Sequence, residues 1–117
     1  MNLFDLLFGK PVSTINPLEL NERLKNGKRT LVIDVRQPDE YRRGHIAGAK
    51  LIPLDKLSRR ITELPQNREI VCVCASGNRS NSATRILVKA GFNATNMKGG
   101  MLSWRRANFP VKKGDAA

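Results

Sequence analysis

The sequence is short of the residues that usually carry metal and cofactor chemistry. Its 117 residues include two cysteines and one histidine, which together do not make a four-ligand zinc site. Aromatic residues make up 5% of the chain, so the stacking side chains with which nucleic-acid binders hold bases are scarce. We therefore expect no metal, no cofactor and no nucleic-acid partner.

The chain also has no long hydrophobic run. None of its apolar stretches approaches the roughly 18 residues that a membrane span needs, so we expect no membrane span. The N-terminal stretch MNLFDLLFGK is interrupted by Asp5 and lacks the basic region and cleavage site of a signal peptide. We interpret residues 1–11 as an amphipathic lead-in that packs on the domain or contacts a partner or a membrane surface. Without an export signal, the thiols are expected to be free in a reducing, cytoplasmic environment.

Acidic residues are outnumbered by basic ones. Lys and Arg total 21 against 10 Asp and Glu, which gives a formal net charge of +11. Basic pairs are spread along the chain, as in Arg42-Arg43, Arg59-Arg60, Arg105-Arg106 and Lys112-Lys113. This distribution predicts either a solvated basic surface or a field that attracts small anions or an acidic protein partner. Residues 111–117 are interpreted as a basic, flexible tail.

Helical and strand patterns alternate along residues 12–110. Buried strands are predicted at residues 30–35 and 69–74, with weaker extended segments at 49–54 and 94–97. Helices are predicted at residues 17–26, 38–43, 55–64, 80–90 and 99–107, where Asn, Asp, Pro and Gly mark starts and stops. The alternation predicts a single α/β domain with a largely parallel sheet and helices on both faces. Because ligands bind at the carboxyl ends of such strands, Asp34 and Cys74 are placed where chemistry is expected.

The loop CASGNRS, residues 74–80, lies between the second buried strand and a helix. A cysteine is nucleophilic only as the thiolate, which amides at a helix N-terminus and nearby cations stabilise. Small residues and a glycine that can adopt positive φ allow this loop to curl with its amides pointing inward. Arg79 offers a fork of donors to an anion, and Ser80 is the expected cap of the helix. We predict a nucleophilic Cys74 within an anion-binding loop of Ala75, Ser76, Gly77, Asn78, Arg79 and Ser80.

The other candidates for chemistry have simpler interpretations. Cys72 lies inside the strand and is interpreted as a core residue. A disulfide between Cys72 and Cys74 is not expected, because two strand residues span about 6.6 Å, near the upper limit for a bridge. A Cys–His hydrolase would need His45 as its base, but His45 lies in a turn and is interpreted as structural.

Three longer stretches carry a resemblance. LVIDVRQPDEYRRGHIAGAKLIPL, IVCVCASGNRS and GFNATNMKGGMLSW resemble the single-domain rhodanese family of sulfurtransferases, over residues 15–104. The resemblance implies a rhodanese-like fold with a parallel sheet of about five strands and helices on both faces. It also implies an enzyme of the thiosulfate:cyanide sulfurtransferase type. Cys74 would take sulfur from thiosulfate or a similar anion, hold it as a persulfide, and pass it to cyanide or a thiol, including a protein thiol.

The same resemblance assigns supporting roles and leaves alternatives open. Asp34 and Arg36 match the family's D-V-R motif and are expected to brace the site, either as a buried ion pair or with Arg36 facing the substrate. A rhodanese-like sulfur carrier or protein-binding module with little turnover is the alternative function. A phosphatase or arsenate reductase is disfavoured, because related phosphatases carry Cys-x5-Arg and only four residues separate Cys74 from Arg79.

Overall fold

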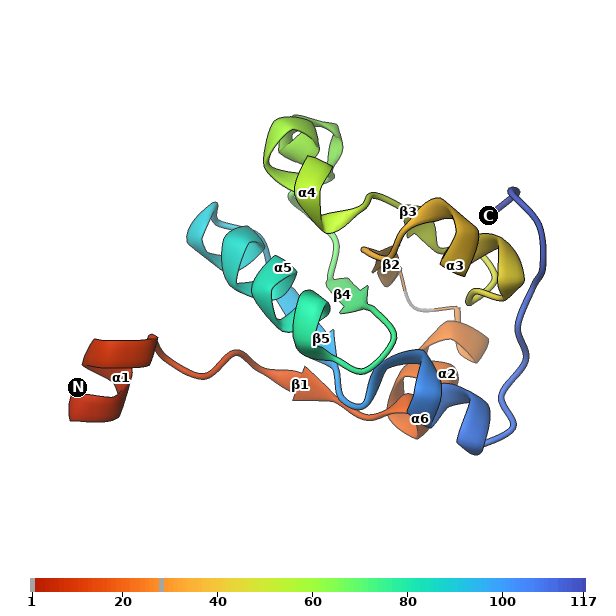
Figure 1. Cartoon of the computed structure of the whole chain (residues 1–117), viewed down its shortest axis with the longest axis horizontal. Helices are drawn as coiled ribbons and strands as arrows, with labels where there is room; N and C mark the ends of the chain where they lie inside the picture. The colour runs from red at the N-terminus through yellow and green to blue at the C-terminus, as the bar shows by residue number, and fades with distance from the viewer. Residues whose placement is uncertain (1, 28) are drawn as a thin grey trace.

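The computed structural model describes residues 2–27 and 29–117, which form a five-stranded sheet flanked by helices (Figure 1). Every pairing between neighbouring strands of this sheet is parallel, in the order β1-β5-β4-β2-β3. The strands are β1 (Thr14–Ile15), β2 (Leu31–Asp34), β3 (Lys50–Leu51), β4 (Ile70–Val73) and β5 (Ala94–Met97). The predicted parallel sheet is confirmed, and β1 was not predicted because two residues carry no periodic signal.

The described residues form seven helical segments, of which all but the first pack around the sheet (Figure 1). They are α1 (Leu3–Phe8), α2 (Pro17–Lys25), α3 (Pro38–Arg43), α4 (Leu54–Leu57), the 3-10 helix η1 (Ser58–Glu63), α5 (Asn78–Lys89) and α6 (Gly100–Arg106). The predicted start of α2 is confirmed, since the Asn16 side chain accepts a hydrogen bond from the Glu19 amide at 2.8 Å. The helix predicted at residues 55–64 is instead the short α4 followed by η1.

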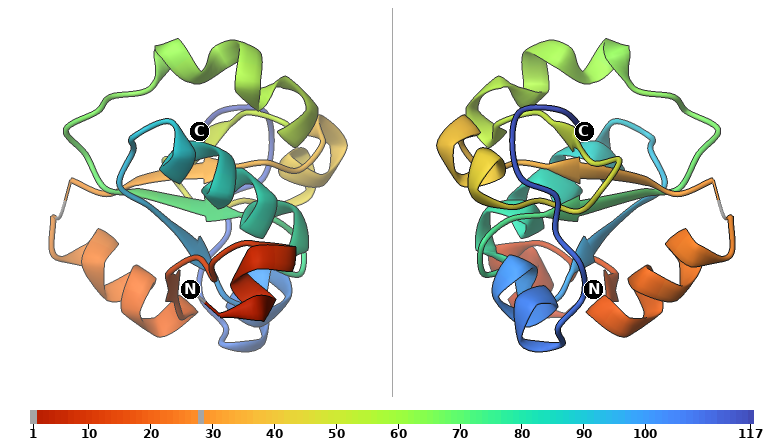
Figure 2. Two further views of the ribbon diagram at one scale, coloured as in Figure 1. Left: turned by 90° about the vertical axis from the view of Figure 1, so that its left-hand side faces the viewer. Right: turned by 90° about the vertical axis from the view of Figure 1, so that its right-hand side faces the viewer.

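Alternate residues of the strands feed two cores, one on each face of the sheet. Ile70 and Cys72 of β4 pack with Leu57 and Leu87 from α4 and α5, whereas Val71 and Val73 pack on the other face. That second core is completed by side chains from three helices: Leu20 of α2, Tyr41 of α3, and Met101 and Trp104 of α6. Figure 2 shows α4 and η1 above the sheet and α2 and α6 below it. This arrangement explains why β4 is apolar at every position.

The N-terminal segment differs from the expectation that it packs on the domain. Helix α1 lies apart from the sheet, at the end of an extended connection (Figure 1). Leu3, Phe4, Leu6 and Leu7 each expose more than 60% of their area. The connection is tied to α5 where Arg85 donates to the Lys10 carbonyl at 2.6 Å. No helix in the described part of the chain is both long enough and apolar enough to cross a bilayer.

Residues 111–117 are not a free tail. Lys112 and His45 exchange main-chain hydrogen bonds of 2.8 and 2.9 Å, and the Gly114 amide donates to the Arg42 carbonyl at 2.9 Å. The His45 ring stacks on Tyr41 and reaches the Ala116 carbonyl through Nε2 at 2.8 Å. The tail therefore runs along α3, because backbone groups and His45 hold it there. Its basic composition gave no indication of these contacts.

Candidate active site

The Cys74 side chain lies just beyond β4, inside a ring of hydrogen-bond donors. Its Sγ accepts from the Gly77 amide at 3.1 Å, the Ser80 amide at 3.3 Å and the Ser80 hydroxyl at 3.2 Å. Gly77 adopts φ +106° at the start of α5, which turns the loop back over the sulfur. The amides of the loop therefore point inward at Sγ, as its composition predicts.

Burial and the hydrogen-bond donors shift the pKa of the Cys74 thiol in opposite directions. Cys74 has no exposed area, and burial raises the pKa of its thiol. Hydrogen bonds from the Ser80 hydroxyl and from the amides of Ser80, Gly77 and Ser76 lower that pKa and together outweigh burial. The pKa of Cys74 consequently lies below its ordinary value. The loop donors therefore favour the anionic form of this buried sulfur.

Cys72 lies on the same strand but lacks the loop donors, and its thiol pKa shifts in the opposite direction. It lies two residues earlier on the same face of β4, in the same core, and burial raises the pKa of its thiol to about 12. A hydrogen bond with Thr84 lowers it only in part. Cys72 is a structural thiol, and the two cysteines are free. The difference between them comes from the loop and not from the strand.

Ser80 is not the cap of the following helix, which corrects the expectation from the sequence. Helix α5 begins two residues earlier at Asn78, with Gly77 in the cap position, and Ser80 lies in its first turn. The Ser80 amide is one of the first-turn amides that no earlier carbonyl of the helix can reach. Its partner is Cys74 Sγ, so the sulfur takes the place that a capping oxygen would have. Only the folded loop brings that sulfur to the helix.

We expect Ser80→Ala to raise the pKa of Cys74 by roughly one to two pH units, because a hydrogen bond to a charged group is worth about 1.5–3 kcal/mol. The amides of Gly77 and Ser80 remain, so the loop keeps part of its effect. The pKa is read from the pH dependence of iodoacetamide alkylation, in a Cys72→Ala background that leaves one thiol. Ser82→Ala, on the exposed side of α5, is the control. An unchanged pKa in Ser80→Ala would contradict the assigned role of the hydroxyl.

Asn96 of β5 is a site residue that the sequence patterns did not single out. The Ser80 hydroxyl has one proton, which it shares between Cys74 Sγ and Asn96 Oδ1, the latter at 2.6 Å. Asn96 Nδ2 donates to the Gly77 carbonyl at 3.2 Å. Asn96 is buried and faces the loop because β5 pairs with β4. It therefore joins both residues whose amides contact Sγ. The pairing of two strands distant in sequence was the missing information.

The start of α6 holds the other side of the loop. The amides of Met101 and Leu102 donate to the carbonyls of Cys74 and Ala75 at 2.8 and 3.0 Å. Gly100 sits between these groups with φ +59°, and a Cβ there would lie 2.5 Å from the Cys74 carbonyl oxygen. Gly100 thus allows α6 to approach the cysteine loop backbone to backbone.

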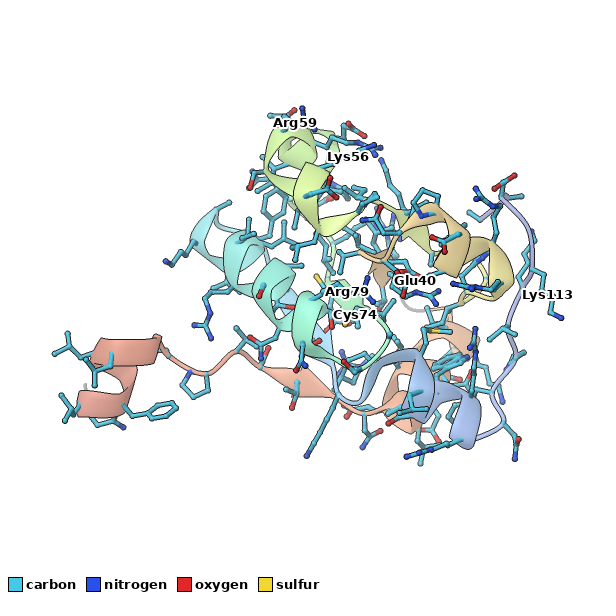
Figure 3. The ribbon with its side chains drawn as sticks, viewed as in Figure 1. Glu40, Lys56, Arg59, Cys74, Arg79 and Lys113 are labelled. Carbon is cyan, nitrogen blue, oxygen red and sulfur yellow. The ribbon has the colours of Figure 1, made fainter. Side chains whose placement is uncertain are left out.

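Arg79 is engaged by a carboxylate. Its guanidinium makes a two-pronged pair with Glu40 of α3, at 2.8 and 2.9 Å. Figure 3 shows the two side chains next to each other above Cys74. The pair joins the first turn of α5 to α3, and Glu40 Oε1 also accepts from the Gln37 amide at 3.0 Å. The fork of donors expected for a bound anion is therefore occupied by Glu40 in this structure.

The same pair makes folding sensitive to acid. The hydrogen bond with Arg79 holds the pKa of Glu40 at about 2, below its ordinary value of 4.5. Because the pKa of Glu40 is lower in the folded state than in the unfolded state, ionised Glu40 stabilises the fold at pH values above its unfolded pKa. This stabilisation is lost as pH falls from about 5 towards 2. Arg79 is 37% exposed, so solvent screening reduces the contribution to about 1 kcal/mol.

We expect Glu40→Gln to lower the unfolding free energy by about 1 kcal/mol at pH 7, and the difference from wild type to shrink towards a pH of about 2.5. Urea unfolding at several pH values measures both quantities. The control is Glu22→Gln, which removes an exposed carboxylate of α2. A difference that stays constant with pH would contradict the role of ionised Glu40.

Asp34 and Arg36 form a buried ion pair beside the loop. Arg36 Nη2 contacts Asp34 Oδ2 at 2.7 Å and donates to the Gly44 carbonyl at 2.8 Å, and both side chains are almost fully buried. The pair fixes the turn between β2 and α3, which carries Glu40. Arg36 also lines the cavity next to the loop. Both sequence expectations for Arg36, the ion pair and the position at the substrate side, are compatible with this geometry.

A cavity of about 720 Å³ opens beside the cysteine loop. Its walls come from the loop, the turn after β2, α3, α6 and the C-terminal segment: Arg36, Glu40, Arg43, Ala75, Ser76, Met101, Leu102, Arg105, Val111 and Lys113. Cys74 does not line this cavity, although Ala75 and Ser76 do. The sulfur lies behind the loop that forms one wall.

Comparisons with known proteins give the family of this chain and relatives with the same fold. A family model described as a rhodanese-like domain matches residues 16–107. A sulfurtransferase from Allochromatium vinosum is 33% identical over 101 residues, covering 86% of this chain and 94% of the relative. The rhodanese-related protein of Thermoplasma volcanium superposes with a TM-score of 0.81 at 34% identity, over 86% of this chain and 97% of that one.

A third relative is a longer protein. The HTH-type transcriptional regulator Rv0324 of Mycobacterium tuberculosis is 40% identical over 110 residues, which are 92% of this chain and 48% of that protein. The chain therefore spans about half the length of this relative. The region matched by the family model holds strands β2 to β5 and the cysteine loop. On the family match, the chain belongs to the rhodanese-like domain family.

Proposed function

We propose that this protein is a sulfurtransferase that moves a sulfane sulfur from a small anionic donor to a thiophilic acceptor through a persulfide on Cys74. The observation that carries the proposal is the convergence of two amides and one hydroxyl on Sγ. These donors stabilise the Sγ thiolate, which attacks the donor and forms again when the acceptor removes the sulfur.

The first half-reaction loads the cysteine. The Cys74 thiolate attacks the outer sulfur of thiosulfate, a new S–S bond forms, and the bond to the sulfonate sulfur breaks. The bonding electron pair leaves with sulfite, so total charge is conserved and no proton is needed. This is the chemistry of thiol–disulfide exchange, which depends on the thiolate fraction of the attacking group. The loop donors lower the pKa of Cys74 and so raise that fraction.

The second half-reaction removes the sulfur from Cys74. The acceptor, cyanide or a thiolate, attacks the terminal sulfur of the persulfide. The S–S bond to Cys74 breaks, and its electron pair returns to Sγ as the thiolate. The acceptor carries the sulfur away as thiocyanate or as a new persulfide. The donors around Sγ again hold the charge that develops on the leaving sulfur.

One observation favours a second candidate, a sulfur carrier or binding module with little turnover. Cys74 has no exposed area, so a small donor does not reach Sγ in this conformation. Turnover requires the loop of Ala75 and Ser76 to move, and the Arg79–Glu40 pair restrains the same end of α5. A module that loads only when a partner opens the loop would have the same resting structure.

Mass spectrometry after incubation with thiosulfate separates the two functions. We expect the intact protein to gain the mass of one sulfur atom on Cys74, and cyanide then to remove it as thiocyanate over many cycles. A carrier that needs a partner to open the loop would gain little or no sulfur from thiosulfate alone. A protein that gains no sulfur from thiosulfate, even with Cys74 reduced, would contradict the proposed donor chemistry.

A further inference from the structure

The cavity beside the cysteine loop is larger than its proposed donor needs. Thiosulfate is a small dianion, whereas about 720 Å³ is the size of a pocket that holds a drug-sized ligand or several residues of a peptide. The cavity walls reach from Ala75 and Ser76 to the C-terminal segment. The additional space is large enough to hold the acceptor of the sulfur. This inference rests on the sulfur transfer proposed above.

Three cations on the cavity wall lack a strong partner within the described residues. Arg105 donates to the uncharged Gly44 carbonyl at 3.4 Å, and Lys113 has no ion pair among residues 2–27 and 29–117. Arg43 pairs with Asp39, but both side chains are more than 60% exposed, where such a pair is worth little. Figure 3 shows Lys113 on the C-terminal segment, away from the Arg79–Glu40 pair.

The remaining charges of the cavity cancel within the protein. Arg36 is neutralised by buried Asp34, and Glu40 by Arg79. An occupant therefore meets a surface that is positive through Arg43, Arg105 and Lys113. This local excess favours an anionic occupant and repels a basic one.

The same cavity presents apolar surface. Leu102 is 51% and Val111 36% exposed, and buried Met101 lines the cavity with them. A small hydrophilic thiol leaves these side chains in water, whereas a polypeptide covers them with its own apolar residues. Large exposed apolar side chains grouped at one cavity are typical of a surface that binds another protein.

We propose that the acceptor is a cysteine within an acidic segment of a partner protein, which docks in this cavity. Its carboxylates contact Arg43, Arg105 and Lys113, and an apolar neighbour covers Leu102 and Val111. Its thiolate attacks the terminal sulfur of the Cys74 persulfide from the cavity side of the loop. The partner cysteine becomes the persulfide, Cys74 regains the electron pair as a thiolate, and no oxidant is consumed.

The test starts from protein already persulfidated on Cys74 and follows sulfur transfer by mass spectrometry. The acceptors are a peptide with Cys flanked by Glu and Leu, the same peptide with Lys in place of Glu, and glutathione. We expect the acidic peptide to react roughly 10-fold or more faster than either other acceptor at low salt, and this advantage to shrink at high salt.

Two sets of charge reversals locate the effect. Arg43→Glu, Arg105→Glu and Lys113→Glu together should abolish or invert the preference for the acidic peptide. Lys56→Glu, Arg59→Glu and Lys89→Glu change the net charge equally but lie outside the cavity lining, and Figure 3 shows Lys56 and Arg59 on the α4–η1 side. This control should keep the preference.

The outcomes that overturn the docking site are distinct from a failure of the enzyme. If glutathione matches the acidic peptide, the acceptor is a small thiol. If both triple variants lose the preference equally, the net charge of the protein causes the preference and no docking site exists. If Cys74 never loads with sulfur, the proposed function fails before the acceptor is tested. Circular dichroism of both triple variants verifies that they are folded.

Discussion

Cys74→Ser is expected to reduce thiocyanate formation from thiosulfate and cyanide by more than about 1,000-fold, because the variant has no atom that can become a persulfide. The serine hydroxyl is close in size to the thiol and can accept from the same Gly77 and Ser80 amides. The fold should therefore persist. The assay is a steady-state rate at saturating thiosulfate.

Cys72→Ala is the matched control for this substitution. It removes the other thiol from the same face of β4 and leaves the loop untouched. We expect nearly full activity and a loss of about 1–2 kcal/mol of stability from the small cavity. Activity that disappears with Cys72 but persists in Cys74→Ser would show that Cys72 is the nucleophile and that Cys74 is not.

Gly100→Ala is expected to lower the free energy of unfolding by roughly 2–4 kcal/mol and to reduce activity more than the loss of folded protein explains. The added Cβ would meet the Cys74 carbonyl oxygen at 2.5 Å and the Ala75 carbonyl carbon at 2.6 Å. These are backbone atoms, so the loop itself must shift. A shifted loop displaces the amides from Sγ, and the pKa of Cys74 rises as a result.

Gly91→Ala separates this steric effect from backbone strain. Gly91 also has a positive φ, of +94°, but a Cβ there meets nothing within 4 Å. The substitution should cost about 1 kcal/mol and leave the thiol unaffected. Denaturant unfolding and thiol alkylation, measured on both variants, make the comparison. Equal effects of the two substitutions would show that Gly100 does not position the loop.

Much of the fold follows from local patterns. The run of residues 30–35 and the all-apolar β4 are typical of strands covered on both faces, and the structure places them at the centre of the sheet. Asn16 and Gly44 mark helix ends that local chemistry determines, so they were predictable. The single helix predicted at residues 55–64 is wrong in detail, because the segment forms the short helix α4 followed by the 3-10 helix η1.

The parts of the site that escaped prediction depend on contacts between distant residues. Arg79 and Glu40 are 39 positions apart, and Asn96 reaches Ser80 only because β5 pairs with β4. The start of α5 was misplaced because the acceptor for its first-turn amide is a cysteine sulfur, which local capping rules do not include. The course of the C-terminal segment depends on His45, whose partner lies 71 residues later.

The exposed lead-in shows a different limit. Its apolar residues indicated an amphipathic lead-in, but composition alone does not say what those side chains contact. In the structure Leu3, Leu6 and Leu7 are exposed, and the domain core closes without them. The parts of the chain needed for the cysteine loop lie within β4, α5, β5 and α6.

The ionisation of one sulfur atom at the end of β4 tests the proposed mechanism most directly. Alkylation of Cys72→Ala across a pH range of about 4 to 10 should show a single thiol with a pKa below the ordinary value of about 8.5 for a free cysteine. A thiol that ionises at or above that value would mean that burial prevails over the loop donors. In that case Cys74 would be a second core cysteine, and the sulfur-transfer mechanism would have no nucleophile.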